Sequence, residues 1–96
     1  MSEVRWHPDA ILDVELARDW YAEQSPFAAR GFLLALESAL EAVVASPEGA
    51  PIKAHECRHY VFPSRYPFTL VYRRGESIEI VAVAHQKRKP GYWGSR

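Results

Sequence analysis

Apolar positions follow a helical period through the first quarter of the chain. One stripe recurs at the spacing of a single helix face: Ala10, Val14, Ala17 and Tyr21. Pro8 suits the first turn of such a helix, because its missing N–H has no partner to bond there. The pattern predicts a helix over residues 8–24 that packs on a core along this stripe.

A second apolar stripe runs along the same predicted helix and consists of Leu12, Leu16 and Trp20. A helix that is apolar on two faces packs on two sides. We therefore expect the second stripe to contact either a neighbouring helix or a partner protein.

The next segment predicts a second helix. Ser25 is a good N-cap, and Pro26 occupies the first helical position. Helical spacing continues through Phe32, Leu33, Leu36, Leu40, Val43 and Val44. The sequence Ser-Pro-Glu-Gly-Ala-Pro at 46–51 ends it. Two helices joined by so short a link should form an antiparallel hairpin.

The remaining chain predicts strands at residues 55–62, 68–73 and 77–84, and residues 3–6 form a short alternating segment that suits an edge strand. A tight hairpin at 74–76 joins the last two. Strict alternation along the last strand places four residues on one face, Ile78, Ile80, Ala82 and Ala84, and three on the other, Glu79, Val81 and Val83.

These elements predict an α+β fold in the order β-α-α-β-β-β, with the helical hairpin packed on one face of a small antiparallel sheet. The chain has 96 residues, which fits a single domain over residues 1–96. Hydrophobic residues make up 48% and charged residues 25%, as in globular domains.

Composition also bears on where the protein works. No apolar run is long enough for a membrane span, and the N-terminus lacks the basic and then apolar layout of a secretion signal. The lone cysteine, Cys57, has no partner for an internal disulfide. We therefore expect a cytoplasmic protein without a membrane partner.

Charge is distributed unevenly although the formal net charge is zero. In residues 1–50, three arginines face nine acidic residues, for a charge of −6; in residues 51–96, nine cations face three acids, for +6. The second half therefore favours an anionic partner. The alternative is that the two charged surfaces are solvated and unrelated.

The strands bring a set of candidate functional residues toward one region if their register allows it: Arg58, Arg65, Arg73, His85, Lys87, Arg88 and Lys89. Arginine suits phosphate or carboxylate, and Tyr66, Tyr92 and Trp93 could stack on bases. His85 could transfer a proton near neutral pH. Each residue also has a structural interpretation, in which the arginines pair with acids and the aromatic rings pack on the core.

A metal site is not predicted. His55 and His59 would share one face of a strand, but no third ligand is apparent. The sequence has no Gly-rich phosphate loop, GxSxG or HExxH motif, and we expect no cofactor.

The chain resembles the RelE/ParE superfamily of toxins from type II toxin–antitoxin systems, often called plasmid stabilisation proteins. The resemblance lies in three blocks: the strand with Arg58 and Tyr60, the run Arg65-Tyr66-Pro67-Phe68 leading into Leu70-Val71-Tyr72-Arg73, and the stretch from Ile78 through Ala84-His85 to Arg88. It covers nearly the whole chain. It implies a cognate antitoxin, a hetero-oligomer with it, and an antitoxin contact for which Leu12, Leu16 and Trp20 are candidates.

The superfamily contains two mechanisms. RelE-like members cut messenger RNA on the ribosome, and their catalytic roles would fall here on Arg58, Arg73, His85, Arg88 and Tyr92. ParE-like members inhibit DNA gyrase and cut no RNA. The sequence pI of about 6.9 and the single Lys53 before the Arg58 strand depart from the strongly basic RelE pattern.

We therefore expect a ParE-like gyrase inhibitor, with a ribosome-dependent mRNA endonuclease as the alternative. A further alternative is a non-toxic module that binds its antitoxin and helps to repress their operon. The expected target-binding residues lie mostly at the C-terminal end: Arg65, Lys87, Arg88, Lys89, Tyr92 and Trp93.

Overall fold

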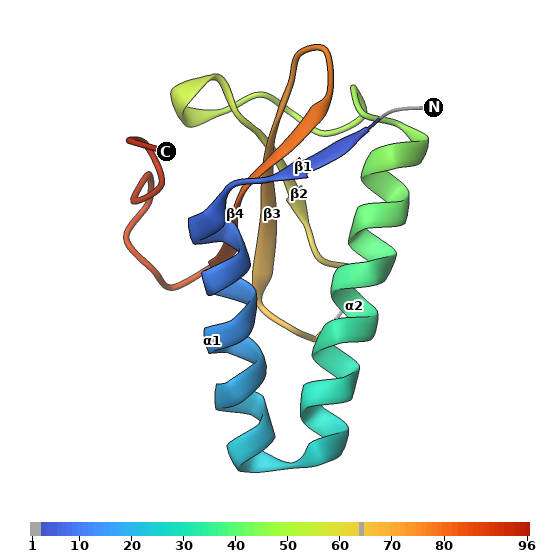
Figure 1. The fold of residues 1–96 in the computed structure, drawn as a ribbon, viewed down its shortest axis with the longest axis vertical. Helices are drawn as coiled ribbons and strands as arrows, with labels where there is room; N and C mark the ends of the chain where they lie inside the picture. Colours follow the sequence, from blue (N-terminus) through green and yellow to red (C-terminus); the bar gives the residue numbers. More distant parts are fainter. Residues whose placement is uncertain (1–2, 64) are drawn as a thin grey trace.

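The computed structural model describes residues 3–63 and 65–96 of the chain (Figure 1). The elements are β1 (Val4–Trp6), α1 (Pro8–Gln24), α2 (Pro26–Ala45), a 3₁₀ turn (Ala54–Glu56), β2 (Arg58–Val61), β3 (Phe68–Arg74) and β4 (Ile78–His85). The predicted α+β class and the element order β-α-α-β-β-β are confirmed.

The four strands form one sheet in the order β1-β4-β3-β2. β2, β3 and β4 are antiparallel neighbours, whereas β1 runs parallel to β4, with Val4 opposite Ile78 and Trp6 opposite Ile80. The sheet is therefore mixed and not wholly antiparallel as predicted. β1 spans only the first part of β4, so the edge of β4 beyond Ile80 has no neighbouring strand among the described residues.

Both helices begin where their capping residues predict. His7 accepts a hydrogen bond at Nδ1 from the backbone N–H of Asp9 (3.1 Å), and Ser25 accepts one at Oγ from Phe27 (3.1 Å). A proline follows each cap at the first helical position. Within the described residues, neither helix is both long and apolar enough to cross a membrane.

The two helices form an antiparallel hairpin that covers one face of the sheet (Figure 1). The main core lies between the hairpin and the sheet, and Ala10, Phe32, Leu70, Tyr72 and Ile80 are fully buried there. The predicted core stripe of α1 is confirmed, because its remaining members Val14, Ala17 and Tyr21 pack against this core.

A second, smaller core lies on the opposite face of the sheet. It consists of Cys57, Val71, Val81, Ala82, Ala84 and Trp93. The prediction of strict alternation along β4 is wrong here. Val71 pairs with Ala82 while Tyr72 pairs with Ile80, so Val81 is an extra residue in a β-bulge. Beyond the bulge the faces exchange, and Val83 joins the main core.

The predicted strand at 55–62 is shorter in the structure, because Ala54–Glu56 forms a 3₁₀ turn and β2 starts at Arg58. His55 and Glu56 have positive φ angles of 58° and 60°, which strand residues do not adopt. His55 and His59 therefore do not share a strand face. Within residues 3–63 and 65–96, no cluster of three or more His, Cys, Asp or Glu could hold a metal ion.

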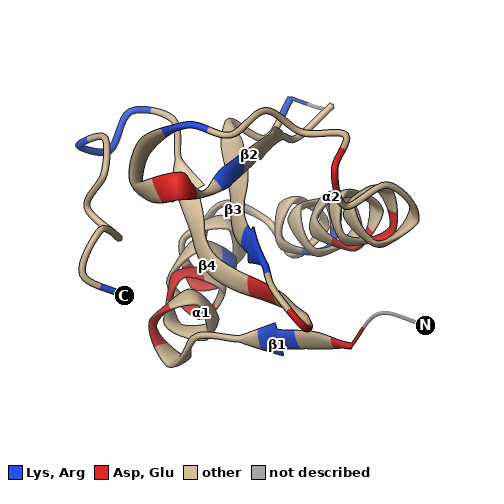
Figure 2. Ribbon diagram, turned by 90° about the horizontal axis from the view of Figure 1, so that it is seen from above, with Lys and Arg blue, Asp and Glu red and all other residues tan. Residues whose placement is uncertain are grey.

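Acidic residues lie mainly on the helices, whereas most cations lie outside the helices, on β1, β2, β3, the loops and the C-terminal segment (Figure 2). Several ion pairs join the two halves of the chain. Arg74 pairs with Glu48, and Arg96 pairs with both Asp9 and Asp13. Part of the charge asymmetry is therefore neutralised inside the molecule.

Candidate functional site

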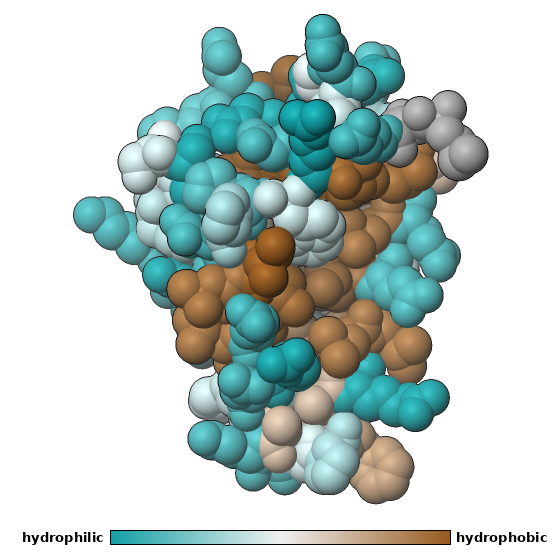
Figure 3. All heavy atoms as spheres, viewed as in Figure 1, coloured by the Kyte–Doolittle hydropathy of each residue, from teal (hydrophilic) through white to brown (hydrophobic). Residues whose placement is uncertain are grey.

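A groove of about 560 Å³ runs between α1 and the ends of β3 and β4. The lining from α1 consists of Asp13, Leu16, Ala17, Trp20 and Tyr21, and the opposite wall consists of Pro67, Phe68, Val83, His85 and Arg88. Most of these side chains are apolar, and Figure 3 shows apolar atoms gathered around the middle of the face that carries both helices. Among the cations of the C-terminal segment, Arg88 lines the groove.

The second apolar stripe of α1 is exposed. Leu12, Leu16 and Trp20 are 49%, 58% and 58% accessible, and Leu16 and Trp20 line the groove while Leu12 lies outside it. The stripe does not pack on α2. Of the two expected contacts, a neighbouring helix is therefore excluded and a partner protein remains. An exposed apolar stripe beside a groove is typical of a surface that binds another chain.

The residue at the floor of the groove, Asp13, escaped the sequence analysis. Its side chain is 5% exposed and accepts hydrogen bonds from the Val83 backbone N–H (3.1 Å), the Tyr92 hydroxyl (3.2 Å) and Arg96 Nη1 (2.7 Å). Asp13 lies three residues after Ala10 and four before Ala17, on the core stripe of α1. An acidic residue in an apolar stripe was the signal available in the sequence.

Tyr92 belongs to the same cluster of contacts. Its ring lies under the guanidinium of Arg88, with 3.8 Å from Cζ to the ring centroid. Burial, together with the nearby Asp13 carboxylate, raises the pKa of Tyr92 to about 12. The Tyr92 hydroxyl is therefore a protonated donor to Asp13 at neutral pH.

His85 ends β4 at the rim of the groove. Its Nδ1 accepts a hydrogen bond from the backbone N–H of Lys87 (3.1 Å), and its ring packs edge-on against Phe68, with 5.1 Å between centroids. A neutral imidazole whose Nδ1 accepts a hydrogen bond carries its proton on Nε2, and this is the tautomer that the contact with Lys87 requires.

Arg58 makes structural contacts in the link that follows α2. Its Nη1 donates to the backbone carbonyls of Glu48 (3.1 Å) and Ala50 (2.7 Å). Arg73 is held on the opposite face of the sheet: Nε and Nη2 contact Glu79 Oε1 at 2.9 and 2.8 Å, and Nη2 also donates to the Arg96 backbone oxygen (2.9 Å).

The strand register separates the five candidate catalytic residues. Arg58 lies opposite Tyr72 and His85 lies opposite Phe68, so the two are separated by four residue steps along β3, or roughly 13 Å. Arg73 follows Tyr72 and therefore points away from the face that carries both. The register therefore does not bring all the basic side chains to one region: His85, Arg88 and Tyr92 lie near Asp13, and Arg58 and Arg73 lie elsewhere.

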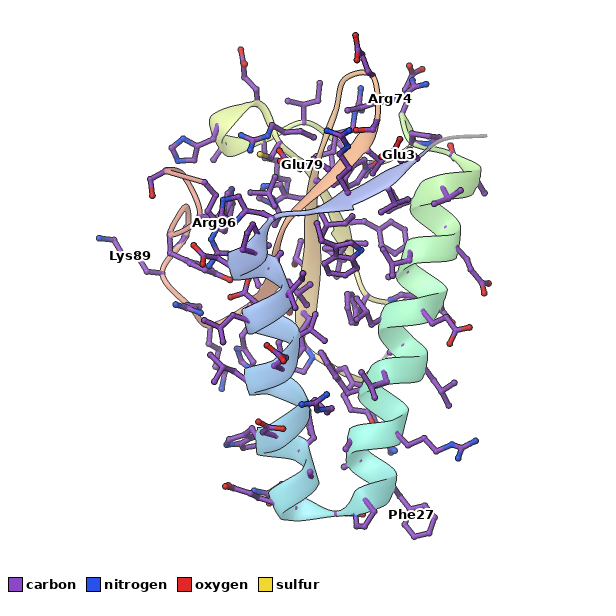
Figure 4. The ribbon with its side chains drawn as sticks, in the orientation of Figure 1. Glu3, Phe27, Arg74, Glu79, Lys89 and Arg96 are labelled. Atoms are coloured by element: carbon purple, nitrogen blue, oxygen red, sulfur yellow. The ribbon has the colours of Figure 1, made fainter. Side chains whose placement is uncertain are left out.

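The predicted target-binding residues differ in accessibility. Arg65, Lys87, Arg88 and Lys89 are exposed, and Lys89 extends away from the body of the protein (Figure 4). Trp93 is 5% exposed and fills the second core. Tyr66 is 8% exposed and donates its hydroxyl to the Ala28 carbonyl (3.0 Å). Neither ring is presented for stacking on a base, because both are part of the packed interior.

Comparison with known proteins gives one decisive finding. The family described as ParE toxin of type II toxin–antitoxin system, parDE, matches residues 4–90, which is most of the chain. The chain belongs to the ParE toxin family. No curated protein matches it significantly.

Membership of the ParE toxin family confirms the resemblance to the RelE/ParE superfamily and selects its ParE branch. The protein is therefore the toxin of a type II toxin–antitoxin system, and a cognate antitoxin is its partner. The match ends at residue 90, so Tyr92, Trp93 and Arg96, which close the Asp13 cluster, lie outside the matched region.

Proposed function

We propose that this ParE toxin arrests growth by binding DNA gyrase and that it cuts no RNA. The observation that carries the proposal is that two of the five residues that a ribonuclease would use, Arg58 and Arg73, lie apart from the other three. Both arginines are held by partners within the chain. Arg58 lies far from His85 along the sheet, and Arg73 lies on the other face of the sheet. Metal-free cleavage of RNA needs a base, an acid and cations around a single phosphate.

The state of Tyr92 supports the same proposal. A general acid or base works best when its pKa is near the working pH. The pKa of Tyr92 is raised to about 12, and its hydroxyl proton is already donated to Asp13. Tyr92 is therefore a poor proton-transfer group for cleavage, whereas it is well placed to support Arg88 in a binding surface.

The alternative of a ribosome-dependent mRNA endonuclease has one specific observation in its favour. His85 and Arg88 both line the groove, so a histidine and an arginine do meet at one accessible place. A nuclease that used only these two groups would require His85 for toxicity.

We also propose that the groove and the stripe of Leu12, Leu16 and Trp20 receive the antitoxin. The groove is mostly apolar, with Arg88 on one side and the exposed Leu16 and Trp20 on the other. An amphipathic helix would bury its apolar face here and place acidic side chains beside Arg88, Lys87 and Lys89. The toxin would then be neutralised as a hetero-oligomer.

The experiment that tests gyrase as the target has two readouts from the same protein. The purified chain is added to gyrase in a supercoiling assay, and new RNA 5′ ends are mapped after its induction without antitoxin. We expect inhibited supercoiling, growth arrest and no new ends, and we expect His85→Ala to retain toxicity.

New ends in codon phase within translated messages, abolished by His85→Ala, would replace gyrase inhibition with mRNA cleavage. Growth that continues normally with the soluble, folded chain present would instead favour the non-toxic, antitoxin-binding module.

A further inference from the structure

We infer that Asp13 is a positioning residue that holds the C-terminal segment, residues 86–96, against the open edge of β4. It thereby fixes the place of the cationic loop, which consists of Lys87, Arg88 and Lys89. The role assigned to the loop rests on the proposed function, in which this loop meets the target. The attachment itself follows from contacts within the chain.

The backbone of the C-terminal segment does not hold it in place. After Gln86, whose N–H donates to the Pro67 carbonyl (2.8 Å), the backbone of the segment forms local turns, such as Tyr92 N–H to the Lys89 carbonyl and Gly94 N–H to the Gly91 carbonyl. No strand ladder joins residues 87–96 to the sheet in the part of the chain that the structure describes. Its position therefore depends on side chains.

Asp13 supplies most of the polar attachment. Both carboxylate oxygens contact Arg96, at 2.7 Å from Nη1 to Oδ2 and 3.3 Å from Nη2 to Oδ1, and Oδ2 also accepts from Tyr92. Arg88 Nη1 lies 3.8 Å from Oδ1. Figure 4 shows Arg96 between the C-terminal segment and the start of α1. Three side chains of the segment thus meet at one carboxylate.

The same contacts occupy the edge of β4 that β1 leaves open. Asp13 accepts from the Val83 N–H (3.1 Å), and Arg96 Nη1 donates to the Val81 carbonyl (3.0 Å). The pair therefore satisfies backbone groups that a neighbouring strand would otherwise bond. A buried carboxylate that accepts several charged and neutral donors is costly to replace, because its partners lose their acceptor together.

Apolar packing adds a second attachment through Trp93, which lies in the second core and contacts His59 edge-on at 5.2 Å between ring centroids. Trp93 anchors the later part of the segment, whereas Arg88 belongs to the cationic loop itself and lies over the ring of Tyr92. Loss of Asp13 should therefore loosen the loop first. Arg88 belongs to both the loop and the groove lining, and Asp13, which it approaches, also lines the groove.

The test compares hydrogen exchange of the full chain with Asp13→Asn, followed by mass spectrometry of peptides. We expect exchange in residues 86–96 to accelerate roughly tenfold or more, the factor for loss of a hydrogen bond to a charged group. Peptides from α2 should keep their rates. Asp19→Asn is the matched control, since Asp19 lies on the same helix but is exposed and pairs with its neighbour Arg18.

The variants R96Q and D13N/R96Q complete a double-mutant cycle. If the two residues act through each other, the double variant should exchange little faster in residues 86–96 than either single variant. Unchanged exchange in residues 86–96 of D13N would overturn the inference. If D13N accelerates exchange throughout the protein, R96Q becomes the deciding variant, because it keeps the hydrogen bond from the Val83 N–H to Asp13. Faster exchange confined to residues 86–96 of R96Q would support the positioning role of Asp13. Unchanged exchange in that segment would overturn it.

Gyrase inhibition by the same variants separates the two proposals. A wild-type chain without effect on gyrase would contradict the proposed function. The attachment of the segment by Asp13 would then be tested by the hydrogen-exchange result alone. If residues 86–96 exchange faster in D13N but the variant inhibits gyrase as well as the wild type, the inference that Asp13 positions the cationic loop for the target would be overturned. We expect D13N to inhibit several-fold less well and D19N to match the wild type.

Discussion

Tyr92 illustrates how burial and a neighbouring acid together raise the pKa of a phenol. Its pKa is raised to about 12 by burial and by Asp13, from about 10 in an unfolded chain. A raised native pKa means that the folded state binds more protons between these two values. The stability from this phenol is therefore complete below about pH 10 and is lost as pH rises toward about 12.

We predict that Tyr92→Phe lowers the free energy of unfolding at about pH 8, and that the wild type loses this advantage at about pH 11. The measurement is urea unfolding of both proteins at both pH values. Tyr60→Phe is the control, because it removes one tyrosine hydroxyl without touching Asp13. A pH-independent difference between wild type and Tyr92→Phe would contradict the prediction.

At the residue scale, the sequence indicated which residues are functional candidates better than it indicated which residues contact one another. His85, Arg88 and Tyr92 were found as candidates from residue type and do cluster. Arg58 and Arg73 were found in the same way. Residue type could not show that Arg58 is bonded to the Ala50 backbone carbonyl and Arg73 to the Glu79 carboxylate. Such contacts depend on tertiary structure, since Arg73 meets the backbone of Arg96 from another element.

At the element scale, α1 serves two surfaces at once. Ala10, Val14 and Ala17 pack on the core, while Leu16 and Trp20 stay exposed at the groove. A substitution on the exposed stripe should therefore separate binding from folding, because it changes little buried area.

We predict that Leu16→Glu changes the free energy of unfolding by no more than about 1 kcal/mol but weakens antitoxin binding by roughly tenfold or more. The affinity is measured with the cognate antitoxin isolated by co-purification. Leu34→Glu on α2 is the matched control, with 53% exposure and no part in the groove. Equal effects of the two variants on affinity would place the antitoxin elsewhere.

The predicted elements show where sequence patterns suffice. Both helices begin as predicted because Ser25-Pro26 and His7-Pro8 act locally, through caps that bond within two residues. The β-bulge at Val81 was missed, since Val81, Ala82, Val83 and Ala84 are all apolar and buried, and an apolar run carries no signal of which face each residue takes. The parallel pairing of β1 likewise depends on elements distant in sequence.

At the scale of the whole molecule, the split between an acidic and a basic half serves folding as well as binding. Arg74 and Arg96 are paired across the two halves with Glu48, Asp9 and Asp13. Lys87 and Lys89 are exposed and form no ion pair within the described chain. The cationic loop therefore keeps charge that is available to a partner, as do the exposed Arg30, Lys53 and Arg65 elsewhere on the surface.

We predict that K87A/K89A raises the toxin concentration needed to inhibit half of the gyrase activity by roughly threefold to tenfold, mainly by slowing association. R30A/K53A removes the same charge from exposed sites away from the loop and should have little effect. The difference between the two double variants should shrink as salt is added, because screening weakens interactions between exposed charges. Equal losses in both variants would mean that net charge, and not the loop, governs the encounter, and the target contact would then lie on another face of the toxin.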